Sequence, residues 1–315
     1  MTGSGRRALV TGGGGFIGSH LTQALLAREW KVCVLDDLST GLRENLREGP
    51  EFCFVQGSIL DKPKVEAAMS GADAVFHLAA AVSVPLSVEN PDESFAANAS
   101  GTLNVLEAAR KCGVKRFVYS SSAAVYGERP ESPKTEDLAP MPVSPYAAGK
   151  LAGEHLVSAY AHSFGMEAVS LRYFNVFGPR QRPDTQYAAV VPAFISRLLA
   201  GRPLIVYGDG EQTRDFTYVE NVVEANLLAA EASGVSGAVM NCASGQEVSV
   251  NRLIEELSQI TGRRPEVTHE PRRAGDVRHS VASTKLAERI LGFKPGVTWQ
   301  EGLRLTVEAA TAGQP

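Results

Sequence analysis

Tyr146 and Lys150 are residue types that can carry acid–base chemistry, and they stand four positions apart in the segment 144–150. On a helix this spacing makes the phenol and the ammonium neighbours, and Pro145 suits a first helical position. A positive charge beside a phenol favours the phenolate, which would make the pair a base near neutral pH. Moving a tyrosine pKa from ~10 to ~7 needs roughly 4 kcal/mol. Chance pairs of this kind are common on helix surfaces, so the rest of the sequence is needed to tell whether this pair is catalytic.

Three glycines near the start of the chain have the spacing of a phosphate cradle. Gly12, Gly15 and Gly18 follow an apolar segment at 8–10, which reads as a buried strand, and a helical pattern follows them. Glycines let the backbone approach a pyrophosphate, and the N-terminus of the next helix offers free N–H groups and a positive dipole. The sequence therefore predicts a dinucleotide-binding turn here.

A pair of carboxylates lies about 20 residues beyond that turn. Asp36 and Asp37 end a second predicted strand at 31–35, which is the position from which an acidic residue binds the adenosine ribose. Two negative charges there repel a 2′-phosphate. We therefore predict NAD rather than NADP as the cofactor.

Composition and charge restrict the class of protein. The chain has 315 residues, 44% of them hydrophobic and 21% charged, with a net charge of −4, as in an ordinary globular enzyme. No long basic run indicates nucleic acid or an anionic membrane as a partner. We expect no membrane span and no signal peptide in residues 1–10. The cysteines are scattered, as in a cytoplasmic protein, and the histidines lack metal-ligand spacing, so we expect no metal site.

Strand and helix patterns alternate along the first half of the chain. Further strands are predicted at 52–55, 74–78, 117–119 and 168–172, and helices at 62–69, 95–112 and 145–163. This alternation predicts an α/β fold of the Rossmann type, in which helices cover both faces of a doubly wound parallel sheet. Ligands of such sheets bind beyond the carboxyl ends of the strands. The candidate residues lie at those ends: Gly12, Asp36, Ala79–Ala80, Ser120–Ser122 and Tyr173–Asn175.

The pattern changes after residue 178. Helices predicted at 188–199, 219–232, 251–260 and 284–291 are separated by short strands such as 204–207. We interpret residues 1–178 as a dinucleotide-binding domain and 179–315 as a smaller, mainly substrate-binding region, from which the chain returns to the sheet near 238–241.

With these motifs in order, nearly the whole chain resembles the extended short-chain dehydrogenase/reductases that act on nucleotide sugars. The shared motifs are the glycine turn, Asp36, the segment 77–80, Ser120–Ser122, Tyr146-x-x-x-Lys150, the segment 171–175, the segment 214–216 and the segment 273–276. Within that group the chain is most similar to 4-epimerases of UDP-glucose and UDP-N-acetylglucosamine.

The resemblance implies a role for each catalytic residue. Ser122 would bind the sugar 4-hydroxyl, and Tyr146 would take its proton as the general base. Lys150 would bind the nicotinamide ribose and lower the pKa of Tyr146. NAD would hold the C4 hydride while the 4-keto sugar turns over, and the hydride would return to the opposite face.

The same resemblance implies the two binding sites. The cofactor site would comprise Gly12, Gly15, Phe16, Ile17, Gly18, Asp36, Asp37, Ser58, Ile59, Leu78, Ala79, Ala80, Asn98, Ser120, Tyr146, Lys150 and Tyr173. The substrate site would comprise Ser122, Asn175, Ala189, Val190, Tyr207, Arg214, Arg273, Asp276 and Ser280. It also implies a homodimer in which the helices at 95–112 and 145–163, both rich in small residues, form a four-helix bundle with their copies.

Three positions refine the expected chemistry. Related dehydratases have acidic residues where this chain has Ala123 and Ala124, which disfavours elimination of water. Ser280 stands where a tyrosine closes the sugar pocket of epimerases restricted to plain hexoses, so an N-acetyl group would fit. Ser58 replaces the usual aspartate at the adenine, although a hydroxyl can still accept a hydrogen bond.

Other functions stay open at this point. The same scaffold serves UDP-glucuronate epimerases and decarboxylases, and reductases of nucleotide sugars, which would show net redox. A non-catalytic NAD-sensing protein is the alternative from another class, and we would expect such a protein to have lost the tyrosine or the lysine.

Overall fold

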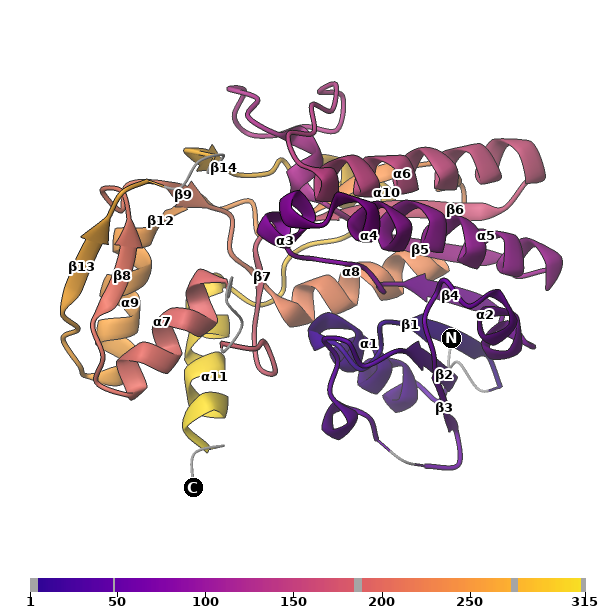
Figure 1. Ribbon diagram of the computed structural model, residues 1–315, viewed down its shortest axis with the longest axis horizontal. Coiled ribbons are helices and arrows are strands. Elements are labelled where there is room, and N and C mark those ends of the chain that lie inside the picture. The colour runs from indigo at the N-terminus through magenta and orange to yellow at the C-terminus, as the bar shows by residue number, and fades with distance from the viewer. Residues whose placement is uncertain (1–4, 48, 184–188, 273–276, 313–315) are drawn as a thin grey trace.

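The computed structural model describes residues 5–47, 49–183, 189–272 and 277–312. Its largest feature is a sheet of seven strands in the order β3-β2-β1-β4-β5-β6-β11, and every neighbouring pair is parallel (Figure 1). The strands are β1 (Arg7–Thr11), β2 (Lys31–Asp36), β3 (Phe52–Gln56), β4 (Ala74–His77), β5 (Arg116–Ser122), β6 (Glu167–Tyr173) and β11 (Val239–Cys242). The predicted Rossmann-type fold is therefore confirmed.

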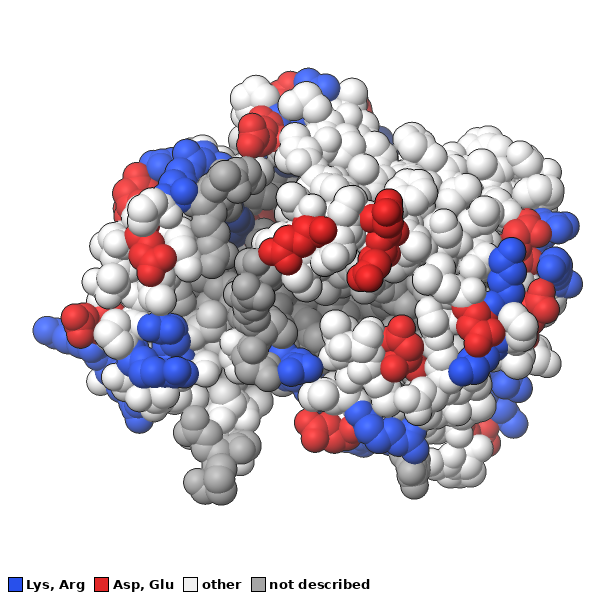
Figure 2. Space-filling model, viewed as in Figure 1, with Lys and Arg blue, Asp and Glu red and all other residues white. Residues whose placement is uncertain are grey.

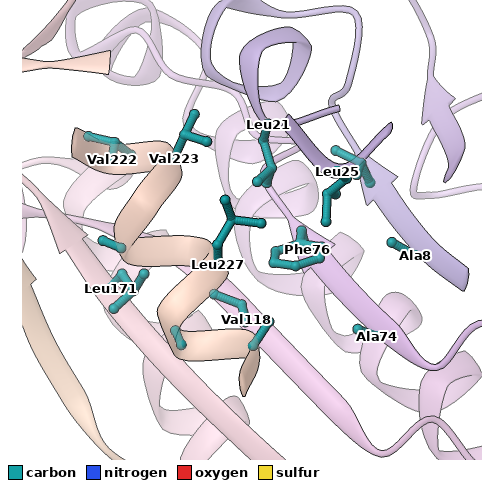
Figure 3. Close-up of a cluster of buried hydrophobic side chains, with 14 of the residues drawn as sticks. Ala8, Leu21, Leu25, Ala74, Phe76, Val118, Leu171, Val222, Val223 and Leu227 are labelled. Atoms are coloured by element: carbon teal, nitrogen blue, oxygen red, sulfur yellow. The ribbon is translucent and has the colours of Figure 1, made fainter. Parts of the chain in front are cut away.

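Helices cover both faces of this sheet. Three of them, α1 (Phe16–Ala27), α8 (Val219–Glu231) and α10 (Lys285–Leu291), bury an apolar cluster against one face. Figure 3 shows Leu21 and Leu25 of α1 and Leu227 of α8 meeting Phe76 of β4. On the other face, α2 (Lys62–Met69), α5 (Gly101–Lys111) and α6 (Pro145–Phe164) cover a second cluster. Strands buried on both faces explain the continuous apolar runs of the sequence.

The long helix predicted at 95–112 is divided into three parts. α4 (Pro91–Phe95) leads into a π-helical turn, η2 (Ala96–Ser100), and then into α5. Asn98 lies in this turn, and its side chain exchanges two hydrogen bonds of 3.0 Å with the backbone of Ala81. A turn of this kind inserts a residue into the helix and is frequent at functional sites. Apolar periodicity does not report such an insertion, which is why the sequence predicted one helix.

A smaller region lies to the left of the sheet in Figure 1. β8 (Leu204–Tyr207) pairs with β13 (Val267–Glu270), and β9 (Thr213–Arg214) lies between β12 (Val248–Ser249) and β14 (His279–Ser280). Its helices α7 (Val190–Leu199), α9 (Val250–Thr261) and α11 (Trp299–Ala312) share a separate apolar core. Two linking strands, β7 (Val176–Phe177) and β10 (Thr217–Tyr218), pair with each other. α11 and the two-residue strands were not predicted.

The chain returns to the large sheet after residue 178. β11 pairs with β6 along residues 239–242, and α8 packs on the same sheet face as α1. These elements belong to the layers of the dinucleotide-binding unit although they come late in the sequence, and the division at residue 178 stays a prediction. Within the described part of the chain, no helix is long and apolar enough to cross a membrane.

Candidate active site

Tyr146 and Lys150 lie in the first turns of α6, as their spacing predicted. The helix begins at Pro145, and the Ser144 hydroxyl caps it by accepting the N–H of Ala147 at 3.2 Å. The N–H of Tyr146 donates to Ser87 Oγ at 3.1 Å, on the short helix α3 (Val84–Glu89). Sequence reasoning missed Ser87, which holds the start of α6 from outside the helix.

The Lys150 side chain is buried and crosses to the carboxyl end of β5. Its Nζ donates to the carbonyl oxygen of Ser120 at 2.8 Å and lies 5.1 Å from the centre of the Tyr119 ring. Burial lowers the pKa of Lys150 to about 7, against the opposing attraction of Glu154. The lysine is thus a group whose charge changes near neutral pH.

The surroundings of the Tyr146 phenol oppose its ionisation in the ligand-free protein. Burial raises its pKa above the ordinary value, and a hydrogen bond with the Ser122 hydroxyl opposes this only in part. The Lys150 ammonium donates to the Ser120 carbonyl, and the expectation that Lys150 lowers the Tyr146 pKa when NAD is bound stays a prediction. Desolvation disfavours the phenolate, and a spacing in sequence does not reveal its size.

Ser122 stands at the end of β5, next to the two alanines noted in the sequence. Its hydroxyl accepts the N–H of Ala124 at 3.2 Å and so caps the short turn η3 (Ala123–Tyr126). Ser122, Tyr146 and Lys150 therefore gather at one strand end. Ala123 and Ala124 add no acidic side chain there.

Glu154 extends the Tyr146–Lys150 stripe by one more turn, and sequence reasoning missed it. It forms a two-pronged ion pair with Arg172 of β6, with N–O distances of 2.9 and 2.8 Å, and accepts a hydrogen bond from Ser121 of β5. The side chains of Arg172 and Glu154 are only 4% and 3% exposed. The i, i+4, i+8 spacing places Glu154 on the same stripe of the helix, but it does not predict the contacts with Arg172 and Ser121.

The glycine turn fits a dinucleotide phosphate. Gly12 has a φ of +72°, and a Cβ there would lie 2.7 Å from the backbone nitrogen of Ala79; a Cβ on Gly18 would lie 2.1 Å from the Gly12 carbonyl oxygen. These two glycines allow β1, α1 and the segment after β4 to approach one another. Gly15 is the N-cap of α1, which has no side-chain cap. Phe16, Ile17 and Gly18 open the helix, so their N–H groups are available to an anion.

Asp36 lies against this turn, as predicted, and Asp37 does not. The buried Asp36 carboxylate accepts the N–H groups of Gly14 and Leu38, each at 2.8 Å. Burial raises its pKa and these hydrogen bonds oppose the rise. Asp37 is exposed and accepts the N–H of Ser39 at 2.9 Å. Of the two acidic residues, Asp36 is therefore the one that contacts the glycine turn.

The remaining predicted cofactor residues lie along the same sheet edge. The segment Leu78–Ala80 follows β4, and the N–H of Ala79 donates to Thr11 Oγ1 at 3.2 Å. Ser58 Oγ accepts the N–H of Leu60 at 3.2 Å, and Ile59 is buried against Gly101. Tyr173 faces the opposite sheet layer, where its hydroxyl donates to Asn226 of α8 at 2.9 Å. The Asn98 side chain hydrogen-bonds to the backbone of Ala81.

The predicted substrate residues are brought together only in part. Arg214 and Ser280 are register partners on β9 and β14. Two residues after Ser280, Ala282 packs with Val125 and Tyr126 in the turn that follows Ser122. Asn175 is exposed with a φ of +23°, Ala189 and Val190 open α7, and Tyr207 ends β8. Arg273 and Asp276 lie outside the described residues.

Asp215 joins these segments, although no role was predicted for it from the sequence. Its fully buried carboxylate accepts the N–H groups of Ser244 and Gly245, at 2.8 and 3.0 Å, and that of Ala282 at 3.2 Å. Figure 2 shows the surface hollowed between the smaller region and the edge of the large sheet. In the described part of the chain, no group of three His, Cys, Asp or Glu side chains is placed to hold a metal ion.

Comparison with known proteins agrees with this geometry. Residues 8–243 match the family described as the NAD-dependent epimerase/dehydratase family. The chain belongs to that family. The predicted resemblance, and with it the prediction of NAD, is confirmed. A curated relative, a UDP-glucose 4-epimerase of Mycolicibacterium smegmatis, is 40% identical over 307 residues, which cover 96% of this chain and 97% of the relative.

Solved structures of epimerases superpose closely on this chain. A UDP-N-acetylglucosamine 4-epimerase of Methanobrevibacter ruminantium, in complex with UDP-N-acetylmuramic acid, has a TM-score of 0.95 and 39% identity, covering 99% of this chain and all of that one. A UDP-glucose 4-epimerase of Thermus thermophilus in complex with NAD has a TM-score of 0.90 and 42% identity, covering 98% and 100%. Both likenesses extend over the smaller region as well as the large sheet.

Proposed function

We propose that this protein interconverts the C4 epimers of UDP-hexoses, using bound NAD. The observation that carries the proposal is the gathering of Ser122, Tyr146 and the buried Lys150 at the sheet edge that also holds the glycine cradle. Acid–base groups and a dinucleotide cradle at one edge are the requirements for reversible oxidation of an alcohol. The alanines after Ser122 favour epimerisation over dehydration.

The chain's own residues bind, orient and move the proton. Ser122 positions the sugar 4-hydroxyl beside the Tyr146 oxygen, and Tyr146 takes the hydroxyl proton and later returns it. Lys150, held by the Ser120 carbonyl, places a positive charge at the same strand end. When bound, NAD supplies the acceptor and donor of the C4 hydride. The free N–H groups in the first turn of α1 would hold the phosphates of NAD, and the Asp36 carboxylate would hold its ribose.

The substrate lies between the sheet edge and the smaller region. Arg214 offers its guanidinium to the diphosphate, because a guanidinium binds phosphate oxygens through paired, charge-assisted hydrogen bonds. Asn175, Ala189, Val190 and Tyr207 complete the wall around the nucleotide. Arg273 and Asp276, outside the described residues, remain predicted substrate contacts.

Ser280 leaves room for an N-acetyl group at C2 of the sugar. Its place beside Arg214, two residues before a segment that packs on the η3 turn, supports a position near the sugar. The enzyme should therefore accept UDP-N-acetylglucosamine and UDP-N-acetylgalactosamine as well as UDP-glucose and UDP-galactose. Ser280→Tyr should reduce turnover of the N-acetylated pair selectively. An equal loss for both pairs would assign Ser280 to folding or general binding.

A homodimer through α5 and α6 belongs to the same proposal. Leu103 on α5, Phe95 at the end of α4 and Phe164 at the end of α6 expose large apolar side chains. Most of the surface over α5 and α6 in Figure 2 carries no charge. A two-fold axis there would cover these helices with their copies. Light scattering at micromolar concentration should give twice the chain mass, and a monomer mass would contradict the dimer.

A substrate panel tests the function. Purified protein is incubated separately with UDP-glucose, UDP-N-acetylglucosamine, UDP-glucuronate, and the GDP and dTDP sugars, and the products are separated. We expect C4 epimers of the UDP-hexoses without net change of NADH absorbance. Net consumption of NADH would indicate a reductase, turnover of UDP-glucuronate alone an epimerase or decarboxylase of that acid, and NAD binding without turnover a sensor.

The cytoplasmic location stays a prediction. It is supported by the four cysteines, Cys33, Cys53, Cys112 and Cys242, all of which are free thiols in the structure.

A further inference from the structure

Glu154 lies on the same stripe of α6 as the two catalytic residues. Tyr146, Lys150 and Glu154 are spaced at i, i+4 and i+8, so all three side chains lie along one line of the helix. Lys150 contacts the backbone of β5 at Ser120, and Glu154 contacts the next residue of that strand, Ser121, through its hydroxyl. Lysine and glutamate therefore attach α6 to neighbouring residues at one strand end.

Arg172 anchors Glu154 to the next strand. Ser121 of β5 and Arg172 of β6 are register partners, and the Glu154 carboxylate binds both. The Arg172 guanidinium carbon also lies 4.6 Å from the centre of the Tyr126 ring, and the Tyr126 hydroxyl donates to Asn241 of β11 at 2.8 Å. The contacts thus run from α6 across the ends of three adjacent strands.

Stability alone is a weak reason for such a pair. Burying two charges costs several kcal/mol for each ion, and apolar replacements of buried pairs are often neutral or stabilising. Arg172 Nη1 is buried and has no hydrogen-bond partner, which adds to the cost of the pair. What the pair does provide is a fixed direction and distance between α6 and the two strand ends, because a two-pronged ion pair is geometrically specific.

We propose that Glu154 is a positioning residue: anchored by Arg172 and Ser121, it sets the height of α6 over β5 and β6 and so places Lys150 and Tyr146 against Ser120 and Ser122. This inference rests on the proposed function for its catalytic readout. Glu154 does not touch the reacting atoms. Its effect passes through Lys150, one helical turn away.

Glu154 also acts on the charge of Lys150. The described titratable groups that face Lys150 are Tyr146 and Glu154 on its own helix, Tyr119 of β5 and His77 of β4. Burial raises the pKa of both tyrosines and lowers that of His77 to about 3, so in the ligand-free protein these three are neutral near pH 7. Glu154 is the charged member of this set. Its attraction favours protonated Lys150, and Arg172 stands on its far side.

Two substitutions separate placement from charge. Glu154→Gln keeps the shape and removes the charge, so protonated Lys150 should become harder to hold. We expect kcat to fall on the order of 10- to 100-fold, KM for UDP-glucose to stay within about 3-fold, and the alkaline limb of the kcat profile to move to lower pH by about 1 unit. Glu154→Asp keeps the charge and shortens the reach, so kcat should fall while the alkaline limb stays in place.

Glu167→Gln is the matched control. Glu167 pairs with Arg116 at 2.9 Å, and these residues are register partners at the amino ends of the same two strands. The control should leave kcat, KM and the pH profile unchanged. A Glu154→Gln protein with wild-type kcat and pH profile and only a lower melting temperature would overturn the inference. If that variant does not fold, Arg172→Lys tests the same anchor, and an unchanged kcat and profile would again overturn it.

A second readout keeps this inference distinct from the proposed function. Binding of NADH, followed by its fluorescence across pH, needs no turnover, and it would depend on Lys150 through the contact with the nicotinamide ribose that the family resemblance implies. Glu154→Gln should move the alkaline loss of NADH binding to lower pH, and an unmoved binding profile would contradict the positioning role. A wild type that binds NADH but epimerises no sugar would sink the proposed function alone.

Discussion

The two ends of β5 and β6 place the same kind of ion pair in different surroundings. At the amino end, Arg116 meets Glu167, whose side chain is 53% exposed. At the carboxyl end, Arg172 meets Glu154, and both side chains are buried. An ion pair with one partner in solvent has a small desolvation cost and contributes little to stability, whereas a buried ion pair has a large desolvation cost that its directed contacts must offset. The comparison shows that the ion pair with the larger desolvation cost and the more specific geometry lies at the carboxyl edge of the sheet. That edge also carries the candidate active site.

The largest expected effect comes from Tyr146→Phe, which removes one oxygen at the carboxyl edge. Turnover of UDP-glucose should fall on the order of 10²–10⁴-fold, the usual contribution of a general base. The melting temperature should change little, because the ring keeps its packing. Epimerisation at near-normal rate in this variant would show that another group is the base.

Gly18→Ala should damage cofactor binding and stability together. The added Cβ would lie 2.1 Å from the Gly12 carbonyl oxygen, whereas a Cβ at Gly15 would lie 3.2 Å from the same atom. We expect Gly18→Ala to lose retained NAD and about 2–4 kcal/mol of unfolding free energy, and Gly15→Ala to lose much less stability. Thermal melts and nucleotide release on denaturation measure both. Equal behaviour of the two variants would mean that the close approach at Gly18 is not limiting.

Lys150→Met should stabilise the protein while it abolishes function. Burial lowers the folded-state pKa of Lys150 to about 7, whereas the unfolded chain titrates near ~10.4. Between these values the unfolded chain binds more protons, so wild-type stability rises with pH across that window and the cost of the buried charge is greatest below it.

Each unit of pKa shift corresponds to about 1.4 kcal/mol, which outweighs the loss of about 1 kcal/mol from the hydrogen bond to Ser120. In nucleotide-free protein, the melting temperature of Lys150→Met should therefore exceed that of the wild type most at about pH 6, with a gain that shrinks toward about pH 10. A gain in melting temperature that does not depend on pH, or a lower melting temperature than wild type at about pH 6, would contradict the claim that Lys150 is buried with a depressed pKa.

The smallest effect belongs to the amino end of the sheet. Glu167→Gln should change the unfolding free energy by less than about 1 kcal/mol, because the Glu167 carboxylate is half in solvent, and should leave epimerisation unchanged. Urea unfolding and the UDP-glucose assay check this. A loss of turnover in this variant would erase the contrast between the two ends of β5 and β6.

The sequence predicted the sheet because its strands are short, apolar and separated by helices of ordinary length. Local spacing also predicted the glycine cradle, Asp36 and the Tyr146–Lys150 pair, whereas the choice of Ser122 among the hydroxyls at the end of β5 came from the family resemblance. The π-turn at Asn98 and the two-residue strands β9 and β14 were not predicted from the sequence. Their hydrogen bonds join segments that are far apart in the chain.

Two further features depend on burial or register rather than on local spacing. The upward shift of the Tyr146 pKa comes from desolvation, which a helical spacing does not encode. The role of Glu154 becomes visible only when strand register brings Ser121 beside Arg172.

The fate of the hydrogen at C4 tests the central claim most directly. UDP-glucose carrying deuterium at C4 is incubated with purified protein in ordinary water, and the UDP-galactose formed is examined by mass spectrometry and NMR. The account predicts UDP-galactose with the deuterium retained at C4 and no net accumulation of NADH. Absence of the epimer, or an epimer whose C4 hydrogen comes from the solvent, would contradict it.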